Sequence, residues 1–434
     1  MIDRLLKWLE RSTCNFLAVK TIEEELLKKG FIELRQNESW QIEAGKKYYM
    51  KKNGSAVFAF TTGKGLSSYK KGCKLIAAHS DSPCFKLKPA PEIYGDGGVV
   101  SLNVEKYGGG ILYTWFDRPL SLSGRITVKS EDIMTPEEIY FDLRRPVAVI
   151  PHLAIHFNRT VNEGNPISVQ KDMKPVVGYF SKEKITEAIK GRGIVLEEIA
   201  RHCGVSADDI LDYEINLYPV EKPQLCGISH EYIESGRIDD LSMAFAGLEA
   251  LLNTCDVETD NLRILAIFDN EETGSGTKQG ASSPVLRDMM ERICESLGGT
   301  HEDFYIGMAN SFMISADDAH AWHPNYSEKY DPTNHPVIGG GPVIKINSNC
   351  KYMTDSVGAA VFKEVCREAG VKCQMFVNHS DMAGGSTLGN LLTAQLDIRG
   401  VDVGNAIWAM HSAVETAGVS DHVDMVKVMS RFWK

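Results

Sequence analysis

The sequence predicts an α/β protein: a central mixed sheet with helices on both faces, interrupted by an inserted β-rich domain. After about residue 230, short apolar strand-like runs alternate with amphipathic helical runs, which is the pattern of such a sheet. From 89 to 230 the chain is instead rich in Gly, β-branched and aromatic residues, as in antiparallel sheet. We therefore predict a main domain formed by 1–88 and 231–434, and an inserted domain at 89–230.

The first 88 residues contain helical, hairpin and strand signals. The first thirty positions fit an amphipathic helical region, and Gly30 is a natural stop. In "KKYYMKKNGSAVFAFTT", Asn53-Gly54 suits a type I′ turn between two strands. "CKLIAAHSDSP" is a short apolar strand that breaks into polar residues at His79.

The last two hundred residues alternate between strands and helices. "DDLSMAFAGLEALL" and "SSPVLRDMMERICESLGG" have helical periodicity, the second with a Ser cap, a Pro in the first turn and a final Gly. "KCQMFVNHSDMAGGSTLGNLL" and "VDVGNAIWAMHSAV" read as strand, polar turn and helix. The inserted domain has one helical segment near 183–202. An open sheet of this kind binds ligands beyond the carboxyl ends of its strands.

Composition excludes several classes of function. The net charge of −11 argues against nucleic acid and anionic membrane as partners. No run of about 18 apolar residues is present, so no membrane helix is expected. The start lacks the apolar core of a signal peptide, and none of the ten cysteines forms a C-x-x-C pair. Free thiols without an export signal indicate a cytoplasmic location.

Acids and histidines recur at the predicted strand ends and helix starts. They are His79 with Asp81, Asp239 with Asp240, Glu271 with Glu272, Asp317 with Asp318, and His411. Taken alone, each of these residues is more often a turn residue, a helix cap or part of a charged surface than a functional residue. Together at one sheet edge, they have the ligand chemistry of divalent metals, with two ions favoured over one. Adjacent Glu residues in an extended turn point different ways, so one can bind metal while the other faces substrate.

At these residues the chain resembles the aspartyl aminopeptidases, which are dinuclear zinc metallo-aminopeptidases. The similarity runs nearly end to end. It is carried by "AAHSDSPCFKLKP", "GGGILYTWFDRPLSLSGRI", "IPHLAIHFNR", "SGRIDDL", "FDNEETGSGTKQGA", "SADDAHAWHPNYSEKYDPTNHPVI", "GPVIKIN", "GGSTLGN" and "AMHSAVET". The resemblance implies two Zn²⁺ ions, although carboxylate-rich sites also accept Mn²⁺ or Co²⁺.

The resemblance also assigns roles to individual residues. The implied metal ligands are His79, Asp239 as the bridging carboxylate, Glu272, Asp317 and His411. Glu271 is implied as the general base that takes a proton from the metal-activated water. Asp81 is expected to orient His79 from behind.

Substrate contacts carry over onto His156, His320, Lys345 and Tyr352, and His156 is expected to reach the site of a neighbouring subunit. The resemblance implies a large closed homo-oligomer, a dodecamer, with the inserted domain mediating assembly. The expected substrates are peptides.

Two departures from the family pattern affect the site. The family commonly has Asn where Asp240 stands, so an additional acid lies beside the bridging ligand. A second His-Ser-Asp sequence lies at 379–381, and on sequence alone its histidine competes with His79 for the role of metal ligand. We interpret His379 as a turn residue.

The predicted function is zinc-dependent removal of N-terminal residues, Asp or Glu, from peptides. A second hypothesis is a dinuclear zinc hydrolase of another bond, such as a deacylase or carboxypeptidase, which needs an arginine clamp; Arg118 and Arg237 are the candidates. A third is an assembly or cargo-binding shell that has lost activity. An intact Glu271 with five intact ligands favours the enzyme.

Overall fold

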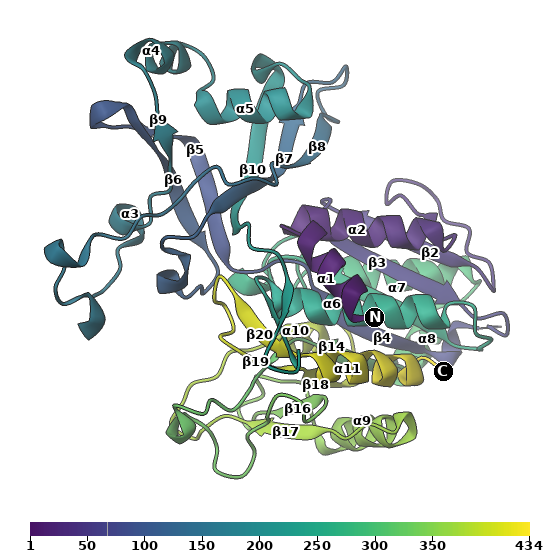
Figure 1. The fold of residues 1–434 in the computed structure, drawn as a ribbon. Helices are drawn as coiled ribbons and strands as arrows, with labels where there is room; N and C mark the ends of the chain where they lie inside the picture. Colours follow the sequence, from purple (N-terminus) through teal and green to yellow (C-terminus); the bar gives the residue numbers. More distant parts are fainter. Residues whose placement is uncertain (67) are drawn as a thin grey trace. The chain divides into compact units, whose positions relative to one another are not determined.

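The computed structural model describes residues 1–66 and 68–434, which divide into two compact units. The first unit comprises Met1–Asp81, Pro223–Met410 and Glu415–Lys434. The second comprises Ser82–Lys222 together with His411–Val414. Figure 1 shows the helices and strands of each unit.

The boundaries of the second unit differ from the predicted 89–230. β5 (Cys84–Tyr94) pairs with β10 (Ile210–Pro219), so the chain enters the second unit before residue 89. β11 (Gln224–Cys226) pairs with β12 (Tyr232–Ser235), which returns the chain to the first unit before residue 230. Strand pairing sets both borders. The change in Gly and aromatic composition along the sequence does not reveal which strands pair.

The first unit is built on a nine-stranded mixed sheet. In spatial order its strands are β1 (Ile32–Glu33), β2 (Lys47–Lys52), β3 (Ala56–Thr62), β13 (Leu262–Phe268), β4 (Cys73–His79), β14 (Phe312–Ala316), β18 (Arg399–Gly404), β16 (Val343–Ile346) and β17 (Gln374–Val377). The four central strands β13, β4, β14 and β18 are parallel to one another, and β3 and β16 run antiparallel to their central neighbours. The carboxyl ends of the central strands therefore lie at one edge.

Helices cover both faces of this sheet, as predicted (Figure 1). One face packs against α1 (Ile2–Arg11), α2 (Asn15–Lys28), α6 (Ile238–Thr254), α9 (Ser356–Ala369) and α11 (Val419–Phe432). The other packs against α7 (Val285–Ser296), α8 (His301–Ala309) and α10 (Leu388–Thr393). Along β4, Ile76 and Ala78 join the first core, while Leu75 and Ala77 join the second. This period-two alternation means that β4 is buried on both sides.

Local signals in the sequence have mixed outcomes. Asn53 and Gly54 have φ of 57° and 65°, as the predicted type I′ turn between β2 and β3 requires. The first thirty residues are helical, as predicted, and form the two helices α1 and α2. The turn at His411 leads not into a helix but into strand β20 (Glu415–Gly418), which pairs with β12 and β19 (Ala406–Trp408). These strands, with β11 and β15 (Ala319–His320), make a small second sheet.

The second unit contains an antiparallel six-stranded sheet with its own core. Its order is β8 (Glu137–Asp142), β7 (Leu120–Val128), β10, β5, β6 (Val99–Tyr107) and β9 (Val176–Tyr179). Its helices are α3 (Val169–Asp172), α4 (Lys182–Lys190) and α5 (Ile194–Cys203). The predicted segment at 183–202 is thus two helices, separated at Gly191 and Gly193. Across residues 1–66 and 68–434, no helix is both long and apolar enough to cross a membrane.

Short 3₁₀ turns complete the structure. They are η1 (Tyr69–Lys71), η2 (Asp96–Gly98), η3 (Leu112–Trp115), η4 (Ile155–Phe157), η5 (Val161–Glu163), η6 (Ala207–Asp209), η7 (Glu271–Thr273) and η8 (Ser327–Lys329). Of these, η7 lies directly after the central strand β13 and carries both glutamates of the predicted site.

A buried histidine in the first unit's core packs against an aromatic ring. His422 of α11 is 1% exposed and stacks on Phe245 of α6, with ring centroids 5.9 Å apart. Neither ring nitrogen has a hydrogen-bond partner within the described part of the chain. Burial, assisted by the chain's amino terminus, lowers the pKa of His422 from 6.5 to about 4. The native state therefore holds a neutral imidazole where the unfolded chain takes up a proton.

We predict that His422→Leu weakens the dependence of stability on pH below neutrality. Between pH 6.5 and about 4 the unfolded wild-type chain binds a proton that the native state does not, so native stability falls as the pH drops. This contribution is roughly 3 kcal/mol at the acid end. Thermal unfolding at pH 7 and pH 4.5 should show a smaller loss in the variant. An equal loss in both proteins would contradict the account.

Candidate metal centre

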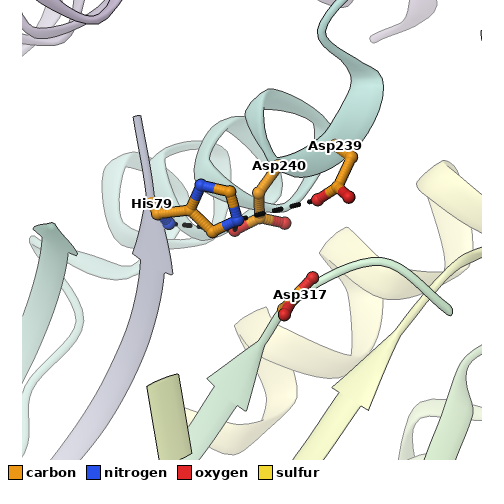
Figure 2. Close-up of side chains that lie close together, drawn as sticks. All are labelled: His79, Asp239, Asp240 and Asp317. Atoms are coloured by element: carbon orange, nitrogen blue, oxygen red, sulfur yellow. Dashed lines mark hydrogen bonds and ion pairs between the residues drawn. The ribbon is translucent and has the colours of Figure 1, made fainter. Parts of the chain in front are cut away.

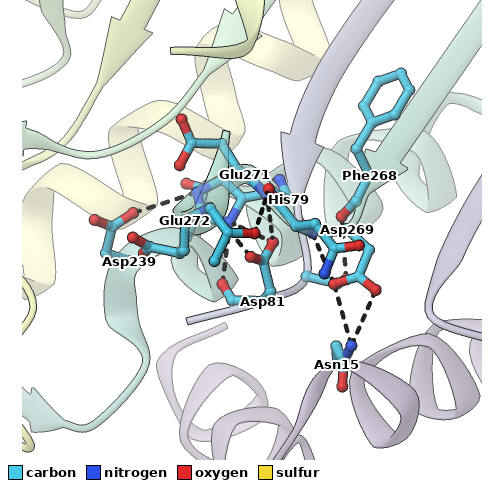
Figure 3. Close-up of polar contacts among 12 residues, drawn as sticks. Asn15, His79, Asp81, Asp239, Phe268, Asp269, Glu271 and Glu272 are labelled. Atoms are coloured by element: carbon cyan, nitrogen blue, oxygen red, sulfur yellow. Dashed lines mark hydrogen bonds and ion pairs between the residues drawn. The ribbon is translucent and has the colours of Figure 1, made fainter. Parts of the chain in front are cut away.

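The ends of two neighbouring parallel strands create the site. β4 ends at His79 and β13 ends at Phe268, and the Ser80 N–H donates to the Phe268 carbonyl at 2.8 Å. The chain then turns through Asn270, with φ of 63°, into η7. The left-handed residue reverses the chain just beyond the strand. The two glutamates consequently lie beside His79 (Figure 3).

Asp81 ties this turn to His79. Its Oδ1 accepts from the Glu271 N–H at 3.1 Å, and its Oδ2 accepts from the Glu272 N–H at 3.2 Å. Nδ1 of His79 lies 3.3 Å from Asp81 Oδ1 and 3.0 Å from the Asp81 backbone carbonyl oxygen (Figure 3). One buried carboxylate thus positions the imidazole and both glutamate backbones, which suits the orienting role expected of it.

Asp269 anchors the same turn from the other side, and the sequence analysis missed it. The Asn15 side-chain amide, at the start of α2, donates to both Asp269 carboxylate oxygens at 3.1 Å (Figure 3). Asp269 Oδ1 also accepts from the Asn270 N–H at 2.8 Å. Its position directly before Asn270 and the glutamates is the only sequence signal that could have found it.

Asp239 and Asp240 bring carboxylates from the start of α6 to His79. His79 Nε2 lies 3.6 Å from Asp239 Oδ1 and 4.0 Å from Asp240 Oδ2, and the His79 N–H donates to Asp240 Oδ2 at 2.9 Å (Figure 2). The peptide bond between the two aspartates is cis. The Asp239 N–H in turn donates to Glu415 Oε2 at 3.1 Å, so a second residue missed from sequence holds this turn.

Asp317, directly after β14, completes the cluster from a third strand end (Figure 2). Within the first unit, two overlapping groups have ligand atoms that all lie within 4.8 Å of one another: His79, Asp239, Asp240 and Asp317 form the first, and His79, Glu271 and Glu272 the second. The residues arrive from β4, α6, η7 and the end of β14. This is the convergence at the carboxyl edge that the sequence pattern predicts.

The electrostatics of the cluster favour a bound cation. Burial, with repulsion from neighbouring acids, raises the pKa of Glu271 to about 8 and that of Asp317 to about 6. Burial likewise raises the pKa of Asp240 and Glu272 well above their usual ranges. Burial alone would lower the pKa of His79, but the surrounding aspartates raise it well above normal. The site holds more buried negative charge than one imidazole offsets.

The donor set fits divalent metal. Asp240 Oδ1 is buried and accepts no hydrogen bond from any described residue. Imidazole nitrogen and carboxylate oxygen are ordinary ligands of zinc and of similar ions. A divalent cation at this position offsets both the desolvation and the mutual repulsion of the acids.

Lys345 and Tyr352 lie beside Asp317. The Lys345 ammonium donates to the Asp318 carbonyl at 2.8 Å, lies 3.7 Å from Asp317 Oδ2, and sits 5.6 Å from the Tyr352 ring centroid. Lys345 is 3% exposed. Burial opposes its charge, yet Asp317 raises the pKa of Lys345, so it stays cationic.

The histidines expected at the site lie in different surroundings. His320 is exposed, with its ring 5.9 Å from that of Phe376. In the second unit, His156 is exposed on η4, and His411 is half-buried with Nδ1 3.4 Å from the Gly109 carbonyl oxygen. His379 accepts from the Asp381 N–H at 3.2 Å, a turn contact, and belongs to neither group of ligand atoms above.

Asp402 is a further acid near the cluster that sequence reasoning missed. It is fully buried within β18, and its carboxylate accepts from the Thr387 hydroxyl at 2.7 Å and the Met353 N–H at 2.5 Å. Because it sits inside a strand rather than after one, the strand-end pattern did not mark it.

A mixed α/β sheet with acids and an imidazole gathered at its carboxyl edge defines a protein built to bind divalent metal, and comparison with known proteins agrees. The family model described as "Aminopeptidase I zinc metalloprotease (M18)" matches residues 8–433. A "Probable M18 family aminopeptidase 2" of Clostridium novyi (strain NT) is 44% identical over 431 residues, covering 99% of this chain and 98% of the relative. Its counterpart in Pseudomonas savastanoi pv. phaseolicola is 39% identical over 429 residues, covering 99% and 97%.

Solved structures are similar over the whole chain. A chain of the "Cryo-EM structure of the Ape4 and Nbr1 complex" superposes with a TM-score of 0.95 at 35% identity, covering 99% of this chain and 84% of that one. The "Structure of S. cerevesiae mApe1 dodecamer" gives a TM-score of 0.85 at 28% identity, covering 99% and 95%. The chain belongs to the M18 family of zinc metallo-aminopeptidases, hydrolases that act on peptide bonds. The family resemblance drawn from the sequence motifs is confirmed at this level.

We predict that Asp240→Asn stabilises the metal-free protein. The substitution keeps an oxygen that accepts from the His79 N–H and removes a buried carboxyl group whose ionised form is disfavoured by burial and by the neighbouring acids. After chelation, the melting temperature should rise by a few degrees.

A matched control is Asp421→Asn. Asp421 is buried elsewhere and accepts from the N–H groups of Gly339 and Gly341 at 2.7 and 2.9 Å, so its variant should melt lower. A metal-free Asp240→Asn protein that melts below wild type would show that the charge of Asp240 is compensated without metal.

Proposed function

We propose that this protein removes N-terminal acidic residues from peptides, using two zinc ions and Glu271 as the general base. The observation that carries the proposal is the buried group of carboxylates and imidazole around His79, which fits divalent cations and leaves a second glutamate beside them. Membership of a zinc aminopeptidase family supports the reaction class.

The proposed ligands are His79, Asp239, Glu272, Asp317 and His411, with Asp239 shared between the ions. Two overlapping groups of ligand atoms, both containing His79, support room for more than one cation. His411 enters the set through the family resemblance, in which the histidine of "AMHS" completes the ligands. Mn²⁺ or Co²⁺ would suit the same donors.

Glu271 is proposed to move the proton. When bound, the ions would polarise the scissile carbonyl and make water acidic enough to ionise near neutral pH. The Glu271 carboxylate accepts the proton of the attacking water and returns it to the leaving amine nitrogen. The Asp81 contact to the Glu271 N–H at 3.1 Å holds this residue in place. His320 and Tyr352 are the protein groups proposed to stabilise the oxyanion.

Acidic specificity is assigned to Lys345 and His156. Lys345 is buried and cationic and has three donors, of which the Asp318 carbonyl uses one. A charge-assisted hydrogen bond from Lys345 to the substrate's side-chain carboxylate would separate Asp and Glu from neutral residues. His156, exposed on η4, is proposed to act in a neighbouring subunit's site.

We further propose a homo-oligomer, in which the second unit mediates assembly. The mApe1 structure to which this chain is similar is described as a dodecamer, which supports that size here. All ten cysteines are free thiols, which supports a reducing cytoplasmic location.

The alternative function, hydrolysis of another bond, is disfavoured because both arginines that could clamp a substrate carboxylate already contact protein groups. Arg237 donates to the carbonyl oxygens of Ser12 and Leu9, at 3.1 and 3.5 Å. Arg118 is paired with Glu221 at 2.9 Å in the second unit. Both guanidinium groups have protein partners. A shell that lacks activity is disfavoured by the intact Glu271 and metal ligands.

Glu271→Gln should retain metal and lose turnover. The amide cannot accept the water proton, so kcat should fall by about 10²- to 10⁴-fold. The matched control is Glu272→Gln, which should lose zinc together with activity. Zinc content and aminopeptidase rate measured on both variants separate the roles. Full activity in Glu271→Gln would exclude this residue as the base.

Lys345→Met should reduce discrimination between acidic and neutral substrates. The ratio of kcat/KM for aspartyl over leucyl anilide should fall by about tenfold or more, as expected for one charged hydrogen bond. Comparing the ratio within each protein cancels any general loss of activity. The exposed Lys351→Met is the control. Wild-type enzyme that cleaves the leucyl substrate faster would rule out acidic preference.

A further inference from the structure

The amino ends of the central strands surround a second cavity in the first unit. The cavity is about 340 Å³, within the range of small-ligand sites. It opens where β4, β14 and β18 begin, beneath α9 and the end of α11. Four cationic side chains line it: Lys71, Lys74, Arg399 and Arg431.

This cavity lies far along the sheet from the candidate metal centre. Lys74 and His79 both belong to β4 and are five residues apart. At about 3.3 Å per residue, they are separated by roughly 16 Å. A ligand in the cavity is therefore not a substrate at the metal centre.

Only half of the cations here have a carboxylate partner. Arg431 pairs with Glu368, and Lys71 Nζ lies 3.1 Å from Asp260 Oδ2. Among the described residues, no carboxylate lies within ion-pair distance of Lys74 or Arg399. The chain carries a net charge of −11, so two unpaired cations lining one cavity run against its overall acidity.

Lys74 is held in a strained electrostatic setting. It is half-buried, with its ammonium 5.8 Å from the Phe432 ring centroid. Burial lowers the pKa of Lys74, and repulsion from Arg263 and Arg431 lowers it further, whereas Asp260 and Glu368, which also lines the cavity, act in the opposite direction. A bound anion would offset both effects.

We propose that this cavity binds a small phosphorylated molecule, with its phosphate between Lys74 and Arg399. A phosphate monoester carries close to two negative charges at neutral pH, which matches two unpaired cations. The planar guanidinium of Arg399 suits two phosphate oxygens at once. Asn261 and Asn310 also line the cavity, the Asn310 amide donating to the Lys70 carbonyl at 2.8 Å, and Phe312 and Val365 give the organic part an apolar wall.

The test is isothermal titration calorimetry of the zinc-loaded full-length protein with ribose 5-phosphate at low salt. Ribose and succinate are the comparison ligands. Lys74→Met and Arg399→Gln are the test variants, and Arg35→Gln, exposed and outside the cavity, is the matched control. Aminopeptidase activity without added ligand should stay unchanged in all three, because none belongs to the catalytic site.

Ribose 5-phosphate should bind wild type and Arg35→Gln with similar affinity, and each test variant at least tenfold more weakly; ribose should not bind. Three results would overturn the proposal. No binding by wild type is the first. The second is binding of ribose 5-phosphate by Lys74→Met and Arg399→Gln with the same affinity as by wild type, which would place the phosphate elsewhere. Succinate binding as tightly as the phosphate ester is the third, since it would make the cavity a carboxylate site.

Discussion

Mutual repulsion among buried carboxylates is the constraint on which the rest of the first unit depends. Asp239, Asp240, Glu272 and Asp317 lie around the single imidazole of His79. Burial raises the pKa of Asp240, Glu272 and Asp317, because desolvation disfavours their charge. Such a group is costly in a protein interior unless cations offset it. The same cost favours a divalent cation at this position.

The scaffold meets this constraint with fixed strand ends rather than mobile loops. Parallel β4, β13 and β14 end at one edge, and the carboxylate of Asp81 fixes the imidazole and both glutamate backbones together. Asn15 of α2 holds Asp269 and so anchors the turn from the helical layer. Ligand positions that are set by packing before metal arrives reduce the reorganisation needed for binding and catalysis.

Sequence reasoning found the fold class and most of the cluster, because both leave local marks. Apolar runs that end in His79, Glu271 or Asp317 mark strand ends, and Asn53-Gly54 marks its turn. Asp402 and Glu415 escaped because their importance comes from contacts across the sheet, which adjacent residues do not reveal. The borders of the compact units differ from the predicted 89 and 230 for the same reason, since the strand pairing of β5 and β11 places these strands.

The most direct test of the central claim is the metal content of the fully active protein, measured per chain by elemental analysis. The account predicts two zinc ions per chain, with loss of activity when they are removed and recovery when zinc is returned. Full activity in a protein that retains no divalent metal would contradict it.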